Sequence, residues 1–213
     1  MEVEATIAFY RSAKERLSNT VFKEEIHWQA RSDLSEFGES DLLREAAWVI
    51  LCCGFRESVV RSWFPYISLC FCDWESASTI CENAELCRAT ALSAFRNVRK
   101  VEAIIRTAKY VHDIGFDRYR LAILADPLRS LRSLPYIGQI TSYHLAKNLG
   151  TDVAKPDRHL VRFASSQGFP DVHSLCSAIS QATGDPLRVV DIILWRFLVE
   201  RSRSTGYWGM EGA

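Results

Sequence analysis

Apolar residues recur at intervals of three and four along almost the whole chain, and this spacing restricts the possible folds more than any other feature. The segments 43–51 and 98–111 show it most clearly. The spacing places apolar side chains on one face of a helix, whereas the alternation typical of strands is scarce. Glycine and proline separate the segments and indicate short turns. We therefore predict an all-α fold of short helices.

Composition narrows the class of protein. With 213 residues, of which 48% are hydrophobic, the chain can bury a full core, which excludes a disordered chain. The longest apolar runs, Ala46–Cys53 and Val189–Trp195, are too short to span a membrane, and charges follow Met1 too early for a signal peptide. We expect a monomer without a membrane partner, located in the cytoplasm with the nucleoid or, in a eukaryote, in the nucleus.

Seven cysteines, an odd number without an export signal, indicate reduced thiols. Cys70, Cys72, Cys81 and Cys87 crowd into one stretch and raise the alternative of a zinc site. This stretch lacks a Cys-x-x-Cys pair and a nearby histidine, and its neighbours are apolar. The pattern favours packed thiols and no metal.

Charge is segregated along the sequence although the net charge is zero. Residues 1–87 carry 8 basic and 15 acidic residues, whereas residues 88–162 carry 14 basic and 6 acidic residues. A block of net charge +8 between acidic flanks is typical of a surface that faces a polyanion, and the alternative is a solvated surface with chance clustering.

The segment 131–162 contains the most informative pattern. Pro135 ends one helix, Gly138 allows a tight turn, and helical periodicity resumes over Thr141–Leu149. Two short helices therefore meet at a hairpin. The backbone N–H groups of Gly138, Gln139 and Ile140 would lack intrahelical acceptors and form an anion site suited to a DNA phosphate.

The run LPYIGQIT at 134–141 resembles the hairpin Leu-Pro-Gly-Ile/Val-Gly-x-x-Thr of the helix-hairpin-helix DNA glycosylases. The run DRHLVR at 157–162 resembles the Asp-x-His-x-x-Arg that follows it, 19 residues beyond Gly138. More weakly, 45–60 is similar to the helix and loop that carry the family's DNA wedge, and 97–108 is similar to its Asn-x-x-Lys-x-x-x-Ile helix. The likeness covers roughly residues 42 to 200.

The resemblance implies a two-lobed helical bundle with double-stranded DNA as the partner. Residues 42–150 would form a central six-helix barrel lobe that includes the hairpin, and residues 1–41 plus 151–213 a second lobe. The iron–sulfur cluster of some relatives is not expected, because Cys176 is the only cysteine after Cys87. We therefore expect no cofactor.

Asp157 is the catalytic candidate. It follows Pro156 and precedes the apolar-periodic run His159–Ala164, so it is expected to cap a helix. A carboxylate fixed in this way can stabilise the positive charge that develops on the sugar and activate a water molecule. The alternative is that Asp157 is only a helix cap.

The resemblance also bears on strand cleavage. Bifunctional members carry a lysine where this chain has Ile140, which cannot form a Schiff base, so simple hydrolysis is favoured. Lys147 and Lys155 are alternative amines, although both are expected, with Thr141 and Arg158, to contact DNA. Tyr136 replaces the first glycine of the hairpin, and a positive φ there would strain it.

Base flipping requires a wedge and a pocket. Phe55 and Arg56, after Gly54, are the wedge candidates, with core packing as the alternative for Phe55. Trp28, Tyr143 and Trp195 are candidates for an aromatic base pocket or for ordinary core. Three functions thus stay open: a monofunctional DNA glycosylase, a bifunctional glycosylase and abasic-site lyase, and a non-catalytic DNA-binding protein.

Overall fold

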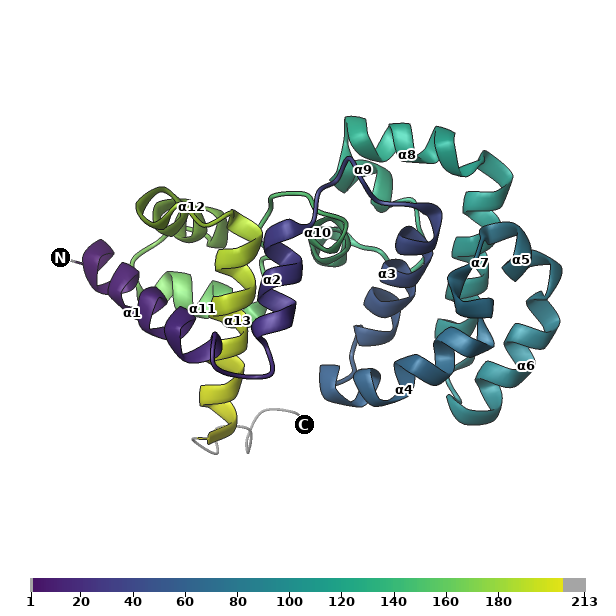
Figure 1. Cartoon of the computed structure of the whole chain (residues 1–213), viewed down its shortest axis with the longest axis horizontal. Helices are drawn as coiled ribbons and strands as arrows, with labels where there is room; N and C mark the ends of the chain where they lie inside the picture. Colours follow the sequence, from purple (N-terminus) through teal and green to yellow (C-terminus); the bar gives the residue numbers. More distant parts are fainter. Residues whose placement is uncertain (1, 205–213) are drawn as a thin grey trace. The chain divides into compact units, whose positions relative to one another are not determined.

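A computed structural model describes residues 2–204, and every element within this range is a helix (Figure 1). The all-α prediction is therefore confirmed. No helix of the described range is both long and apolar enough to cross a membrane. The chain forms two compact units: residues 33–150, here called the hairpin unit, and the described residues of 1–32 and 151–213, here called the terminal unit.

The hairpin unit is organised around one long amphipathic helix, α7 (Val98–Ile114), whose buried face packs against α3, α5, α6 and α8. Asn97 caps this helix by accepting the backbone N–H of Lys100 at 3.2 Å. Its other helices are α3 (Glu39–Cys52), α4 (Glu57–Cys70), α5 (Ala77–Glu82), α6 (Ala84–Ala94), α8 (Phe116–Ala125), α9 (Pro127–Leu131) and α10 (Gln139–Asn148), with a 3-10 turn, η1, at Cys72–Trp74.

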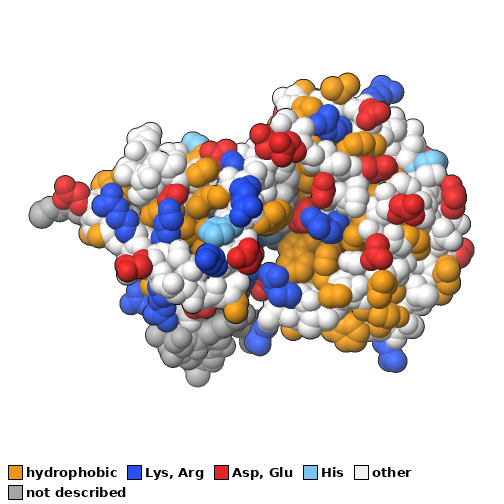
Figure 2. Space-filling view, viewed as in Figure 1, with side chains coloured by type: hydrophobic (Ala, Val, Ile, Leu, Met, Phe, Trp, Pro, Cys, Tyr) orange, Lys and Arg blue, Asp and Glu red, His pale blue; other side chains and the backbone are white. Residues whose placement is uncertain are grey.

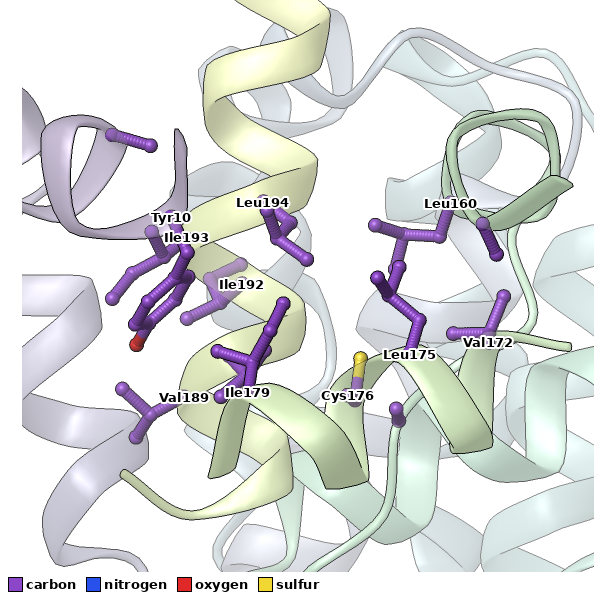
Figure 3. Close-up of a cluster of buried hydrophobic side chains, with 14 of the residues drawn as sticks. Tyr10, Leu160, Val172, Leu175, Cys176, Ile179, Val189, Ile192, Ile193 and Leu194 are labelled. Atoms are coloured by element: carbon purple, nitrogen blue, oxygen red, sulfur yellow. The ribbon is translucent and has the colours of Figure 1, made fainter. Parts of the chain in front are cut away.

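The terminal unit joins helices from both ends of the sequence. It contains α1 (Glu2–Leu17), α2 (Lys23–Arg31), α11 (Arg158–Ser166), α12 (Val172–Thr183) and α13 (Leu187–Ser204). The apolar run 189–194 in α13 packs against the other four helices. Figure 3 shows the resulting core, in which Tyr10, Leu160, Leu175 and Ile193 come from four different helices. Burial of this apolar surface holds the two ends of the sequence together.

The segment 33–41, which the sequence analysis grouped with the chain ends, belongs to the hairpin unit. The guanidinium of Arg120 on α8 donates to the carbonyls of Ser35 and Phe37. At the other end of the unit, Gly150 has φ of +99°, and a Cβ there would lie 2.5 Å from the backbone of Asp33. Glycine is therefore required where the first and last residues of the unit meet.

The four clustered cysteines line the connection from α4 to α6. All are free thiols, Cys87 is buried, and Cys72 and Cys87 share a hydrogen bond. Burial raises the pKa of Cys87 to about 12. Cys72 begins a run of three residues with positive φ, of 55°, 48° and 63°, that turns the chain sharply after α4. No cluster of His, Cys, Asp and Glu with the geometry of a metal site is found among the described residues.

Candidate functional site

The hairpin lies between α9 and α10 as the sequence predicts, but its turn differs in detail. Tyr136 has φ of 63° and is the left-handed residue of the turn. Gly138 has φ of −93° and ψ of −165°, an extended conformation open to any residue, so it is not the glycine that allows the turn. A Cβ on Gly138 would meet only the Oγ1 of Thr141, at 3.9 Å. The packing of the protein itself does not require this glycine.

Of the three backbone donors predicted at the N-terminus of α10, those of Gln139 and Ile140 are available and that of Gly138 is not. The N–H of Gly138 donates to Oγ1 of Thr141 at 2.7 Å, and this hydroxyl lies 3.3 Å from the carbonyl of Tyr136. Gln139 and Ile140 follow as the first two helical residues, and their N–H groups have no acceptor within residues 2–204. Both residues are exposed. The Thr141 hydroxyl therefore fixes the turn and leaves the adjacent N–H groups of Gln139 and Ile140 to donate to an anion.

Lys147 does not fit the role of a phosphate contact. It lies on α10 and is only 4% exposed, so its ammonium group does not face solvent in this structure. The last turn of α10 is buried on every face, since Leu145, Ala146, Lys147 and Asn148 are all buried, so tertiary packing and not helical periodicity encloses Lys147. Ile140, by contrast, is 42% exposed at the start of the helix.

Asp157 is the N-cap of α11, as its sequence context predicts. Its Oδ1 accepts the backbone N–H of His159 at 2.8 Å, and its Oδ2 lies 3.9 Å from Nζ of Lys155. One carboxylate oxygen thus holds the helix, while the other has a loose ion pair and remains partly exposed. Burial lowers the pKa of His159, against the opposing effect of the Asp157 carboxylate.

A buried aspartate holds the non-helical segment 151–157, which ends at Asp157. Oδ2 of Asp191 on α13, which is 2% exposed, accepts the backbone N–H of Lys155 at 2.7 Å. The backbone N–H of Arg188 donates to Asp152 at 3.1 Å. Asp157 is therefore anchored from both sides, by α13 through Lys155 and by α11 through its own cap.

Asp191 is not among the site residues predicted from the sequence, although the sequence contains a signal for it. Asp191 interrupts the apolar run 189–195, and a carboxylate inside such a run needs a buried donor. What the sequence could not give is the identity of that donor, which lies 36 residues away.

The loop after α3 exposes Phe55. Gly54 has φ of +75°, Phe55 is 40% exposed, and its ring lies 5.6 Å from that of Phe95. Together with Leu51, Val59 and Trp63 the two rings line a shallow apolar hollow. Figure 2 shows that hydrophobic side chains gather over α4 on this unit.

Exposed arginines lie in this loop and around the start of α7. Arg56, Arg96 and Arg99 are exposed, and no carboxylate of residues 2–204 pairs with them. Arg61 on the same face pairs with Glu57, and Arg88 pairs with Glu85 and Glu102. The unpaired guanidinium groups beside an exposed aromatic ring are typical of a nucleic-acid surface.

The three aromatic pocket candidates are divided between the units. Trp28 on α2 and Trp195 on α13 lie in the terminal unit, and Tyr143 on α10 lies in the hairpin unit. Trp28 is 38% exposed, whereas Trp195 packs against the core with the guanidinium of Arg196 4.8 Å from its ring. Trp195 thus has the packing of a core residue.

A second concave surface lies on the terminal unit, between α11 and α13. It is an open groove of about 410 Å³, and the side chains lining it include His159, Arg162, Phe163 and Leu198. Arg162 faces this groove. Arg158 lies on the exposed side of α11, one residue after the cap.

Comparison with known proteins gives one informative result. No protein-family model matches the sequence, and a search of curated proteins finds no similar sequence. Among solved structures, the crystal structure of the 8-oxoguanine DNA glycosylase of Thermotoga maritima matches with a TM-score of 0.60 at 18% identity, over 91% of this chain and 95% of that chain. The chain has the helix-hairpin-helix DNA glycosylase fold.

The fold that the resemblance implied is therefore confirmed. Within that fold, the hairpin unit carries the α10 donors, Phe55 and Arg56, and the terminal unit carries Asp157, Lys155 and Arg158. The roles of these residues stay predictions, because a match at 18% identity establishes the fold alone.

Proposed function

We propose that this protein is a DNA glycosylase that hydrolyses the N-glycosidic bond of a flipped base, with Asp157 as the catalytic carboxylate. The observation that carries the proposal is the arrangement of Asp157 in a glycosylase fold: Oδ1 is fixed by the cap of α11, and Oδ2 lies 3.9 Å from Nζ of Lys155. A carboxylate with one fixed and one accessible oxygen suits a cationic transition state.

The chemistry follows from the charge that develops at the sugar. As the C1′–N bond breaks, the base leaves with the bonding electron pair and C1′ becomes oxocarbenium-like. The Asp157 carboxylate stabilises this charge and accepts a proton from the attacking water, whose oxygen bonds to C1′. The departing base takes up a proton. The residues proposed for holding DNA are the α10 donors, which grip a phosphate, and Phe55, which fills the gap left by the flipped base.

A second candidate is a bifunctional glycosylase and lyase, which the proximity of Lys155 to Asp157 favours. In this reaction the neutral amine of Lys155 displaces the base at C1′. The C1′–O4′ bond then opens as O4′ takes a proton, and an iminium forms. Borohydride reduces this species to a covalent adduct, which hydrolysis does not produce. Trapping with wild type and with Lys155→Met separates the two candidates.

The substrate base is best found by a screen. The structural neighbour is an 8-oxoguanine DNA glycosylase, so duplexes with 8-oxoguanine are the first to test here. Duplexes with alkylated, deaminated and hypermodified bases complete the set, because base specificity depends on a few pocket contacts.

The decisive experiment is single-turnover base release by Asp157→Asn. The amide keeps the cap but removes the charge, so we expect normal thermal unfolding and a loss of about a hundredfold or more in rate. Asp171→Asn is the matched control, because Asp171 caps α12 by accepting the N–H of Ser174 at 2.7 Å. If Asp157→Asn releases base at the wild-type rate, Asp157 is only a cap. If wild type binds DNA but releases no base from any duplex, the protein is a non-catalytic binder.

A further inference from the structure

A buried lysine in the hairpin unit joins three segments that are far apart in the sequence. Lys100 on α7 is only 4% exposed, and its ammonium group donates to the carbonyls of Ile50, of Leu51 at 3.0 Å and of Cys53 at 2.7 Å. These carbonyls lie at the C-terminal end of α3, and that of Ile50 also accepts the backbone N–H of Cys53 at 3.4 Å. No carboxylate within residues 2–204 forms an ion pair with Lys100. The negative end of the α3 dipole therefore stabilises its charge.

The same ammonium group also contacts two aromatic rings. It lies 5.2 Å from the centre of the Phe55 ring and 5.6 Å from the centre of the Tyr136 ring. Phe55 belongs to the exposed loop after α3, and Tyr136 is the left-handed residue of the hairpin turn. Both distances are within the range of a cation–π interaction, which is strongest when the cation is shielded from water.

We propose that Lys100 is a positioning residue that fixes the spacing between the Phe55 loop and the hairpin. By contacting both rings, Lys100 holds Phe55 at a set distance from the two donors of α10. A phosphate bound at α10 then determines where Phe55 enters the base stack. The inference rests on the proposed function, because it assigns Phe55 to base flipping.

Loss of the ammonium group should therefore impair base opening more than DNA binding. The carbonyls at the end of α3 would lose their donor and the Phe55 loop would shift, whereas the α10 donors and the exposed arginines would be unchanged. Displacements of about 1 Å cost on the order of a hundredfold in steps that depend on alignment. A residue with a purely structural role would lower stability without separating opening from binding.

The test compares Lys100→Met, which keeps the length of the side chain, with Arg99→Met, which removes an exposed neighbouring cation. The probe is a duplex with 2-aminopurine in a mismatch, whose fluorescence rises when the base leaves the stack. For Lys100→Met we expect binding within about threefold of wild type and an opening equilibrium reduced at least tenfold. Arg99→Met should weaken binding and leave the opening of bound duplex unchanged. Lys100→Arg should restore much of the opening.

A double-mutant cycle with Phe55→Ala tests the mechanism. If Lys100 acts through Phe55, Lys100→Met causes no further loss of opening in the Phe55→Ala background. Fully additive losses, or normal opening by folded Lys100→Met, would overturn the proposal. Should Lys100→Met fail to fold, Tyr136→Leu with Phe55→Ala provides the same cycle, because it removes one ring and keeps the cap of α3.

The probe separates this inference from the proposed catalysis. If the protein opens the mismatch but releases no base, the proposed glycosylase function is wrong. The role of Lys100 in base opening is then still supported, provided that the double-mutant cycle is non-additive. A wild-type protein that never opens the mismatch overturns the inference directly.

Discussion

At the scale of single residues, the hairpin reverses the roles expected for its two central positions. Tyr136 adopts φ of 63°, where a side chain costs about 1–2 kcal/mol, and the contact with Lys100 offsets part of that cost. Gly138 has a conformation that any residue can adopt. Packing within the protein does not require glycine at Gly138, which is exposed and where a Cβ would meet only Oγ1 of Thr141, at 3.9 Å, so we attribute the glycine to DNA binding.

Gly138→Val should accordingly fold normally and bind DNA weakly. We expect a melting temperature near that of wild type and binding reduced about tenfold for every duplex sequence, because phosphate contacts carry no sequence information. Gly38→Val is the matched control: Gly38 caps α3 with φ of −96° and ψ of 178°, and its N–H donates to Asp41 at 3.0 Å. Binding is measured by fluorescence anisotropy at physiological salt. Unchanged affinity of Gly138→Val would remove the hairpin from the binding surface.

At the scale of elements, α3 is joined to α10 by a buried polar pair. Oε2 of Glu45 accepts a hydrogen bond from Nδ2 of Asn148 at 2.8 Å, and Oε1 lies 3.2 Å from the guanidinium of Arg44. Burial raises the pKa of Glu45 above its ordinary value, with Arg44 and Asn148 acting in the opposite direction. The folded protein therefore binds a proton at Glu45 more tightly than the unfolded chain does.

This pair makes stability depend on pH. A pKa that is raised on folding contributes stability below the unfolded value of the carboxyl group, and the contribution is lost as pH rises through the folded value. Glu45→Gln keeps the acceptor for Asn148 but cannot ionise. We expect the variant to melt at a higher temperature than wild type at pH 8, and the difference to shrink toward pH 4.5. Calorimetry at both pH values measures this, and an equal difference at both would contradict the raised pKa.

The elements also show what the sequence could and could not predict. The helices, the hairpin and the Asp157 cap follow from residues within a few positions of each other, and all three predictions are confirmed. Two other contacts join segments that are 36 to 50 residues apart: the hydrogen bonds from Lys100 to the end of α3, and the hydrogen bond between Asp191 and the backbone of Lys155. Residue spacing along the chain does not predict such pairs. Lys147 was assigned to DNA because lysines are ordinarily exposed, yet tertiary packing buries it.

At the scale of the whole molecule, folding mixes the acidic and basic segments of the sequence. The hairpin unit, residues 33–150, contains 14 basic and 14 acidic residues and is therefore neutral. Pairs such as Arg88 with Glu102 neutralise part of the basic block. The cations that can bind phosphate are then the exposed ones without an ion pair, and the net charge of +8 counted along the sequence does not describe the hairpin unit.

Salt dependence tests this distribution. Replacing Arg56, Arg96 and Arg99 together with glutamine should reduce the slope of log affinity against log salt by about 0.9 for each phosphate that the variant no longer neutralises. Arg118→Gln on α8 is the control, since Arg118 is also exposed in the same unit. Affinities measured across a series of salt concentrations give both slopes. A slope shared by wild type and the triple variant would show that these arginines do not face DNA.

The close approach of Gly150 to the backbone of Asp33 means that residues 33–150 are an insertion with adjoining ends. An insertion whose entry and exit points touch can be cut from its gene and closed into a ring by a very short peptide, because almost no chain entropy is lost in joining neighbouring ends. It can equally be reopened at a surface turn to give new termini. Inserting residues 33–150 into a host protein through the same two ends would transfer the hairpin, Phe55 and Lys100 together.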